Sequence, residues 1–142
     1  MLFVNIVADP IDINFMYSRF KNHSHGALTF FFGNVRDINN NLSVSGMRYD
    51  SFVTLAKKTM EEICWEAKKT WGDEIDIFVA HRTGALNVGE TSVAVGVSAV
   101  HRKEALEACR YIIDELKKRV PIWKEEVYKD GGRCWVEGNE LQ

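Results

Sequence analysis

The stretch TSVAVGVSAVHRKEALEACRYIIDELKKRVPIWKEEVY, residues 91–128, carries the pattern of a complete strand–helix–strand unit. Larger apolar residues alternate with small or polar residues over 91–100, and this period of two is expected of a β-strand. Over 102–119 the apolar residues instead return every three or four positions, which predicts an amphipathic helix. Pro121 disfavours helical backbone at Val120, so we expect the helix to end there. The predicted apolar stripe consists of Leu106, Cys109, Ile113, Leu116 and Val120.

The neighbouring segments continue this mixture of helix and strand. Residues 122–137 hold two β-prone runs around KDGG, a turn sequence that predicts a C-terminal β-hairpin. Upstream, apolar residues at near-helical spacing predict a second long helix over 52–71. Residues 74–81 alternate and predict a strand, while the glycine-bounded segment 83–90 is expected to be a connection.

The first third of the chain is expected to begin and end with strands. Residues 2–7 predict a strand and 12–22 a short helix. The dense β-prone run 26–35 is bounded by glycine and predicts a buried strand. The polar, turn-rich segment 37–43 is expected to be a flexible loop. It leads into 44–50, which we expect to be the partner strand of the buried one.

This order of elements favours an α+β fold with largely antiparallel pairing, in one domain over residues 1–142. A chain of 142 residues that is 46% hydrophobic and 27% charged fits one globular domain. No apolar run approaches the roughly 20 residues that span a bilayer. The N-terminus also lacks the basic region of a signal peptide, so we expect a cytoplasmic protein.

The residue types exclude several classes of function. A formal net charge of −2 gives no overall basic field for nucleic acid. Cys64, Cys109 and Cys134 form no C-x-x-C pair, and the histidines have no metal-ligand spacing. Phosphate-loop and serine-nucleophile motifs are absent. The sequence therefore predicts no metal and no bound cofactor, and the cysteines are expected to act as small core residues.

Three consecutive cations close the predicted helix, and they differ in their neighbours. Lys117 adjoins Leu116 on the apolar stripe and has Ile113 four residues before it. It therefore belongs at the edge of the buried face, where an ammonium is useful if an anion binds there. The other two cations follow carboxylates by four residues, a spacing that stabilises a helix by about 0.2–0.5 kcal/mol per pair. These expected surface pairs are Asp114 with Lys118 and Glu115 with Arg119.

Lys124 lies seven residues after Lys117, beyond the turn at Pro121. In a strand it shares a face with Ile122 and Glu126, because side chains alternate between the two faces. The two lysines can then converge on one cleft. The alternative is an edge strand that its charges protect from pairing with another chain.

Two further groups of cations stand at the ends of predicted elements. His101, Arg102 and Lys103 lie where strand gives way to helix, a position that disfavours cations unless an anion binds. The alternative is that these side chains extend into water. Arg36 follows the buried strand and suits a phosphate or carboxylate. The simpler alternatives are a surface pair with Asp37 or a solvated loop.

Five motifs together resemble the family of the large, catalytic subunit of molybdopterin synthase. The likeness covers roughly residues 26–137 in order. It implies an α/β-hammerhead type of fold with additional antiparallel β-structure. It also implies a heterotetramer, in which two large subunits form a central homodimer and a small ubiquitin-like subunit docks on each. The motifs are GNVRD (33–37), YDSF (49–52), HRTGAL..GE (81–90), VGVSAVHRKEAL (95–106) and LKKRVPIWKEE (116–126).

The resemblance also implies a reaction and a set of site residues. The family moves sulfur from a thiocarboxylate, on the Gly-Gly C-terminus of the small subunit, to cyclic pyranopterin monophosphate. The product carries the dithiolene that later binds molybdenum. By resemblance Lys117 and Lys124 are catalytic. The residues implied in substrate binding are Asn34, Val35, Arg36, His101, Arg102, Lys117, Lys124, Glu125 and Glu126.

The sequence departs from the family pattern at two places. Asn34 stands where many relatives carry lysine, which implies a weaker phosphate contact. Some relatives have a C-terminal basic residue that reaches the other protomer. Here Asn139 holds about that place, and Arg133 is a possible substitute.

Three other functions are compatible with parts of the sequence. A persulfide sulfurtransferase would use Cys134, whose neighbour Arg133 favours a thiolate. An RNA-binding module would use the scattered cations together with Trp123, Tyr128 and Trp135 as stacking platforms. A non-catalytic scaffold would only dock a ubiquitin-like protein, although that role gives Lys117 and Lys124 no task.

Overall fold

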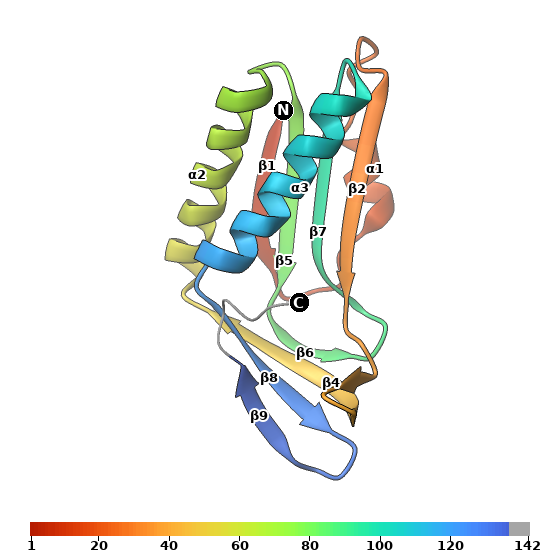
Figure 1. The fold of residues 1–142 in the computed structure, drawn as a ribbon, viewed down its shortest axis with the longest axis vertical. Helices are drawn as coiled ribbons and strands as arrows, with labels where there is room; N and C mark the ends of the chain where they lie inside the picture. The colour runs from red at the N-terminus through yellow and green to blue at the C-terminus, as the bar shows by residue number, and fades with distance from the viewer. Residues whose placement is uncertain (137–142) are drawn as a thin grey trace.

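The computed structural model describes residues 1–136, and its frame is two β-sheets that follow one another along the long axis (Figure 1). The first sheet has the strand order β1-β5-β7-β2. Strands β1 and β5 are parallel, and the other two pairs are antiparallel. The strands are β1 (Leu2–Val7), β5 (Asp76–Arg82), β7 (Thr91–Ala99) and β2 (Ala27–Asn34).

The second sheet has the order β3-β4-β8-β9, and β6 also pairs with β4. Its central ladder is antiparallel and places Tyr49 of β4 opposite Lys124 of β8. Strand β8 therefore lies between two neighbours and is not an edge strand. The strands are β3 (Ile38–Asn39), β4 (Leu42–Ser51), β6 (Gly84–Asn87), β8 (Ile122–Tyr128) and β9 (Arg133–Val136).

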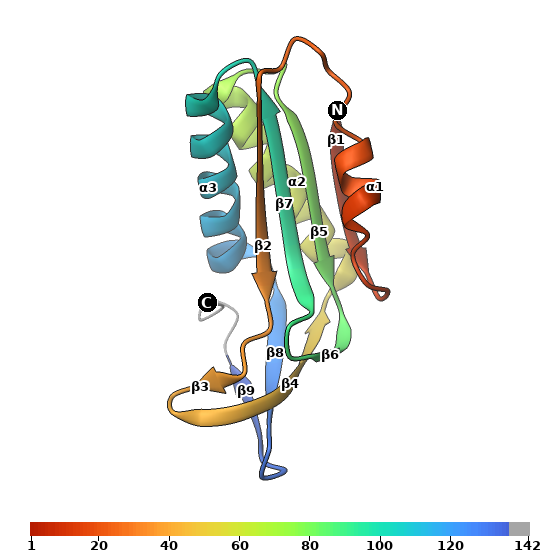
Figure 2. The ribbon, with the colours of Figure 1, turned by 90° about the vertical axis from the view of Figure 1, so that its right-hand side faces the viewer.

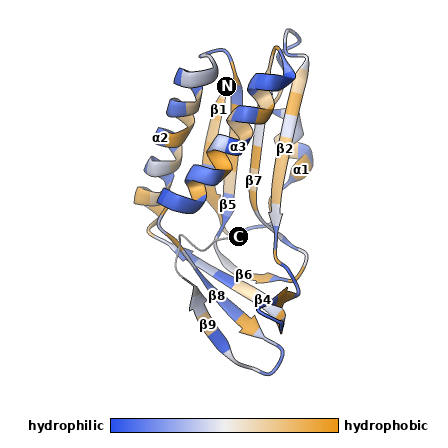
Figure 3. Ribbon diagram, viewed as in Figure 1, coloured by the Kyte–Doolittle hydropathy of each residue, from blue (hydrophilic) through white to orange (hydrophobic). Residues whose placement is uncertain are grey.

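Helices cover both faces of the first sheet, as Figure 2 shows. The long helices α2 (Val53–Trp71) and α3 (Arg102–Arg119) lie on one face, and the short helix α1 (Ile13–Ser18) lies on the other. Because both faces are covered, β5 is buried along its whole length, and hydrophobic residues run along the central strands (Figure 3). The main core includes Met60, Ile63, Ile77, Val95, Ile112 and Leu116.

The end of α3 directs the chain from the first sheet into the second. Val120 has an extended backbone (φ −81°, ψ 127°), and its amide still donates to the carbonyl of Leu116 at 3.2 Å. Pro121 follows, and β8 begins at the next residue. The helix thus ends where the proline predicts, and only Pro121 and the extended Val120 separate the last helical turn from β8.

The α+β class, the two long helices and the C-terminal hairpin are confirmed. Three local predictions are wrong. The segment 44–50 pairs with β8, whereas β2 pairs with β7. The expected loop 37–43 contains a tight hairpin between β3 and β4, whose two turn residues, Asn40 and Asn41, take φ angles of 50° and 63°. The expected connection 83–90 contains the strand β6.

Two details of the helix surfaces also differ from expectation. Leu106 is exposed, because the buried stripe of α3 uses the smaller Ala105 and Ala108 instead. The helix 12–22 is shorter than predicted and ends at Ser18. None of the helices within residues 1–136 combines the length and the apolar character needed to cross a membrane.

Candidate functional site

Two adjoining pockets open where the first sheet meets the second. We call them the Lys117 pocket and the Lys124 pocket, and Asn34 and Tyr49 line both of them. The lysines therefore approach one region from two different elements. The Lys117 pocket is lined by Phe31, Gly33, Asn34, Tyr49, His81, Ser92, Val93, Ile113, Leu116, Lys117, Val120 and Ile122. The Lys124 pocket is lined by Asn34, Val35, Arg36, Ile38, Asn39, Val44, Met47, Tyr49, Lys124 and Glu126.

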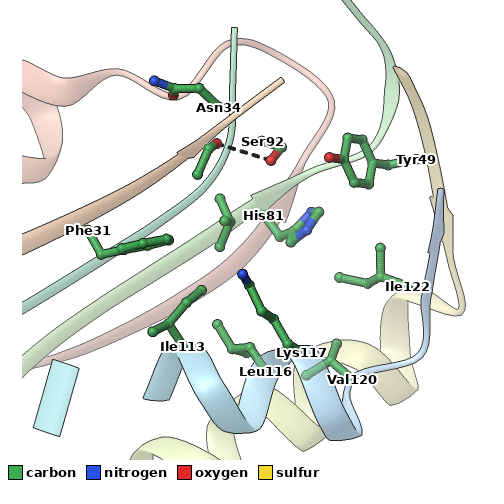
Figure 4. Close-up of a pocket in the computed structure, with 12 residues that line it drawn as sticks. Phe31, Asn34, Tyr49, His81, Ser92, Ile113, Leu116, Lys117, Val120 and Ile122 are labelled. Carbon is green, nitrogen blue, oxygen red and sulfur yellow. Dashed lines mark hydrogen bonds between the residues drawn. The ribbon is translucent and has the colours of Figure 1, made fainter. Parts of the chain in front are cut away.

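The Lys117 side chain rises from the last turn of α3 into its pocket (Figure 4). Phe31 and Ile113 lie on one side of its amino group and His81 on the other, with Ser92 beyond. Most of the other walls are apolar. Opposite charges attract one another more strongly in apolar surroundings than in water. The Lys117 ammonium should therefore attract an anion that enters this pocket.

The other two cations of this helix end face away from the pocket. Lys118 is exposed and lies 3.6 Å from Glu115, not beside Asp114, which pairs with Arg110 instead. Arg119 pairs with Glu115 as expected, at 3.3 Å. The sequence therefore correctly separates Lys117, which points into the pocket, from Lys118 and Arg119, which point outward. The predicted partner of Lys118 is wrong.

Arg119 also joins the two long helices through Glu66 of α2. Its guanidinium donates to both carboxylate oxygens, at 2.6 and 2.9 Å, and the Tyr111 hydroxyl donates to the same group at 2.5 Å. The hydrogen bond from Arg119 lowers the pKa of Glu66 to about 2, and that from Tyr111 adds to the effect. This network fixes the end of α3 from which Lys117 extends.

His81 lines the Lys117 pocket as a buried, neutral imidazole. Its Nδ1 lies 2.7 Å from the carbonyl of Arg82, which can only accept, so Nδ1 carries the proton and Nε2 is left as an acceptor. Burial lowers the pKa of His81 to about 4. The Tyr49 ring packs edge-on at 5.1 Å. Burial also raises the pKa of Tyr49, so both groups are uncharged at neutral pH.

The Lys124 pocket contains a fixed carboxylate beside the lysine. Glu126 is only 1% exposed and lies on the same face of β8 as Lys124, as the alternation predicts. Its oxygens accept from the Asn39 amide at 2.6 and 2.8 Å, and from the Tyr128 hydroxyl at 2.5 Å. The hydrogen bond to Glu126 raises the pKa of Tyr128 to about 12. Glu126 therefore holds the β3–β4 hairpin against β8.

The segment after β2 forms the shared wall of the two pockets. The β2–β7 register shifts between Gly33 and Asn34, an irregularity of the kind that re-aims side chains at the ends of strands. Val35 is buried, whereas Asn34 and Arg36 are exposed at the pocket. The Asn34 side chain is fixed by a 2.8 Å hydrogen bond from Thr91.

Three residues of the predicted substrate set lie away from both pockets. Glu125 is on the opposite face of β8 from Lys124, where Arg133 contacts it at 3.4 Å. His101 and Arg102 are exposed at the first turn of α3. At about 1.5 Å per residue, the helix separates Arg102 from Lys117 by roughly 20 Å. One chain therefore brings together Asn34, Val35, Arg36, Lys117, Lys124 and Glu126, but not these three.

The cysteines lie apart from the two pockets. Cys64 and Cys109 are buried, and burial raises their pKa values to about 12 and about 11, so both thiols stay protonated. Cys134 is exposed on β9, and its neighbour Arg133 forms an ion pair with Glu125. Asn139 lies outside the described residues. Among the described residues, no group of three or more His, Cys, Asp or Glu side chains is placed to hold a metal ion.

Sequence reasoning missed Tyr49 and His81 as pocket residues. Both fall within motifs that carry the family resemblance, but local patterns show only that each lies in a strand. Their meeting depends on the pairing of β4 with β8 and on the contact between the two sheets, which no local pattern encodes.

Comparisons with known proteins identify the family of this chain. Residues 6–119 match the family model described as MoaE protein. The molybdopterin synthase catalytic subunit of Synechococcus elongatus is 50% identical over 117 residues, which is 82% of this chain and 71% of that protein. The crystal structure of molybdopterin synthase from Staphylococcus aureus superimposes with a TM-score of 0.88 at 31% identity, and covers 94% of this chain and 96% of that one.

A more distant structure shares the fold alone. It comes from a complex of subunits 1 and 2 of the molybdopterin-converting factor of Helicobacter pylori, with a TM-score of 0.74 at 23% identity over 99% of this chain and 92% of that one. The family model and the Synechococcus relative each match about four fifths of the sequence. The chain therefore belongs to the MoaE family, the family of molybdopterin synthase catalytic subunits.

Proposed function

We propose that this chain transfers sulfur from the C-terminal thiocarboxylate of a small ubiquitin-like subunit to cyclic pyranopterin monophosphate, with Lys117 and Lys124 as catalytic residues. The observation that carries this proposal is the convergence of the two lysines on adjoining pockets that share Asn34 and Tyr49. They come from α3 and β8, and the extended turn at Pro121 sets their relative positions.

The charges of the site suit this chemistry. The donor thiocarboxylate and the substrate phosphate are both anions, so they approach one another only where preorganised cations offset their repulsion. Sulfur attack on the substrate forms a C–S bond and a tetrahedral centre with a developing oxyanion. Water then cleaves the bond between this sulfur and the acyl carbon of the small subunit, which leaves the sulfur on the pterin and an ordinary carboxylate on the small subunit. An ammonium in a mostly apolar pocket stabilises that oxyanion and can donate the proton with which water later leaves. Lys117 and Lys124 carry these two tasks between them.

The remaining pocket residues have binding roles. Arg36 is exposed at the mouth of the Lys124 pocket and is suited to a phosphate group. Glu126 is already held by Asn39 and Tyr128, so its role is to orient Lys124 and to keep the β3–β4 hairpin beside it. Asn34 contributes an uncharged contact, and the buried Val35 contributes backbone. The neutral Nε2 of His81 offers an acceptor to an N–H or O–H group of the pterin.

His101 and Arg102 fit this function only in a homodimer. They are too far along α3 to reach the pockets of their own chain. We propose that each chain of a central homodimer presents its first helical turn to the pockets of the other, with a small subunit on each chain to complete a heterotetramer. The two-subunit complex named for the Helicobacter pylori relative supports a small-subunit partner. A biosynthetic enzyme of this kind is expected in the cytoplasm.

Reconstitution tests this function. The chain is mixed with a thiocarboxylated small subunit and cyclic pyranopterin monophosphate, and the dithiolene product is measured over a single turnover. Product is expected with the thiocarboxylate donor. The same small subunit with an ordinary C-terminal carboxylate is the matched control and should give none. Absence of product with the thiocarboxylate, in a sample that contains the complex of both subunits, would refute the proposal.

A further inference from the structure

The motif HRTGALNVGE, residues 81–90, contains an ion pair behind the site. Arg82 is the last residue of β5 and is only 7% exposed. Its Nη1 pairs with Oε2 of Glu90, and its Nη2 donates to the carbonyl of Ala8 at 3.3 Å. A guanidinium withdrawn from water needs such partners, so the pair holds Glu90 in one place. Neither Arg82 nor Glu90 lines the Lys117 pocket or the Lys124 pocket.

The backbone around Glu90 fixes the shared wall of the two pockets. The amide of Val35 donates to the carbonyl of Glu90 at 2.9 Å, and the amide of Gly89 donates to the carbonyl of Val35 at 2.8 Å. Val35 stands between Asn34 and Arg36. The segment 34–36 therefore takes its position from residues 89 and 90 and not from a continuation of the regular β2–β7 ladder.

Arg82 also fixes the opposite wall through its backbone. Its carbonyl accepts from Nδ1 of His81 at 2.7 Å, which sets the tautomer and the direction of the imidazole. The Glu90 carboxylate in turn accepts a hydrogen bond from the backbone amide of Asn87 at 3.3 Å and so closes the turn after β6. One ion pair thus connects the strand end that carries His81 with the turn that holds Val35.

We propose that Arg82 and Glu90 form a positioning pair, which places Arg36 and Asn34 for substrate binding without touching the substrate. This inference rests on the proposed function for its effect on catalysis. The hydrogen bond from Arg82 lowers the pKa of Glu90, so the carboxylate stays charged and paired at neutral pH. The pair also explains the presence of Arg82 and Glu90 in the motif HRTGALNVGE, since neither residue lines a substrate pocket.

The test uses Glu90→Gln, which keeps the size of the side chain and removes its charge. Its matched control is Glu66→Gln, which removes the same charge from the ion pair with Arg119, whose hydrogen bonds join α2 to α3 and do not involve residues 34–36 or 89–90. Amide hydrogen exchange at Val35 should become at least about tenfold faster in Glu90→Gln, because the turn that holds this amide loosens, and should not change in Glu66→Gln. Unchanged exchange in Glu90→Gln would overturn the proposal.

Kinetics then test the consequence for the substrate. In the reconstituted complex, Glu90→Gln should raise the KM for the pterin substrate about tenfold and lower kcat by less than about threefold, because the lysines are untouched. Added to Arg36→Ala, it should have little further effect on KM, since both act through the same contact. A normal KM, or fully additive effects, would overturn the positioning role. An inactive wild-type complex would refute the proposed function instead, and the exchange experiment would still test the pair.

Discussion

The two ends of α3 carry cations in opposite situations. At the last turn Lys118 and Arg119 have carboxylate partners within the chain, and Lys117 extends into a pocket. At the first turn His101 and Arg102 are exposed, and neither side chain has a hydrogen bond or ion pair within the described residues. The last turn also lies at the negative end of the helix dipole, which favours cations, whereas the first turn lies at the positive end.

This difference indicates that the two ends have different kinds of partner. The cations of the last turn are explained by the fold of one chain and its pocket. The cations of the first turn are placed against the helix dipole, and Glu104 of the same turn forms no ion pair with His101 or Arg102, so no partner among residues 1–136 accounts for these two cations. In the proposed homodimer, an anionic substrate held in the pockets of the second copy would supply the missing charge.

Replacing the inward lysines should have the largest effect. Lys117→Ala and Lys124→Ala are expected to fold and to bind the small subunit, yet lose sulfur transfer by orders of magnitude, because each removes a charge aimed at the transition state. Arginine should rescue poorly at either position, since it does not release a proton. Single-turnover product formation at saturating small subunit measures the loss. Nearly normal turnover by Lys117→Ala would contradict the distinction between Lys117, which acts in the pocket, and the outward-facing Lys118 and Arg119.

Replacing the first-turn arginine should have a smaller effect on binding. Arg102→Ala should weaken substrate affinity roughly ten- to a hundredfold, the range expected for a charged hydrogen bond of about 1.5–3 kcal/mol. Its unfolding midpoint should be unchanged, because the side chain has no hydrogen bond or ion pair with any of residues 1–136. Equilibrium binding of the substrate and thermal unfolding, measured on one preparation, separate the two effects.

Mixed dimers sharpen this prediction. If Arg102 serves the partner's pockets, a dimer of one Lys117→Ala chain and one Arg102→Ala chain has one intact site and one site with both defects. Random reassociation of equal amounts makes half of the dimers mixed, so about a quarter of wild-type activity should return. No recovery after verified subunit exchange would mean that Arg102 does not act across the dimer.

Acid should weaken the anchor of the last turn. The folded pKa of Glu66, about 2, lies below its usual value of 4.5. Its contribution to stability is therefore present above about pH 4.5 and is lost as the pH falls toward 2. The effect should be small, because the group is exposed. Urea unfolding should show a stability difference between wild type and Glu66→Gln near pH 6 that shrinks near pH 3, and a difference independent of pH would contradict this assignment.

Lys118→Ala should have the smallest effect of all. Its single surface pair with Glu115 is worth a few tenths of a kcal/mol, and its side chain faces away from the pocket. Urea unfolding and single-turnover sulfur transfer should both stay close to wild type. An inactive Lys118→Ala would show that the wrong cation of the three has been assigned to the chemistry.

The sequence predicts best those features that depend on neighbours in the chain. The strand at 2–7 and the helix 102–119 are found at their predicted bounds, because periodicity and Pro121 determine them locally. The inward direction of Lys117 follows from the apolar stripe. The shared face of Lys124 and Glu126 follows from strand alternation.

Features that depend on distant pairing were missed. The alternation of β4 fits either sheet, so the sequence predicts the wrong partner strand and does not identify Tyr49 as the wall between the two pockets. The polar residues around Asn40 and Asn41 predict a flexible loop, because the sequence of a tight turn has the same polar character. The resemblance implies that Glu125 contacts substrate, whereas strand alternation places it on the opposite face of β8 from Lys124.

The connection between α3 and β8 is so short that its length alone determines which face of β8 points to the pocket. Only Val120 and Pro121 separate the last helical turn from the strand. One residue inserted there would exchange the two faces of β8, so that Trp123 would point to the pocket and Lys124 to the outside. Length changes at KDGG, between β8 and β9, leave that face untouched. Among homologous chains, insertions and deletions should therefore accumulate in the hairpin turn and be selected against beside Pro121, even where the residues themselves vary.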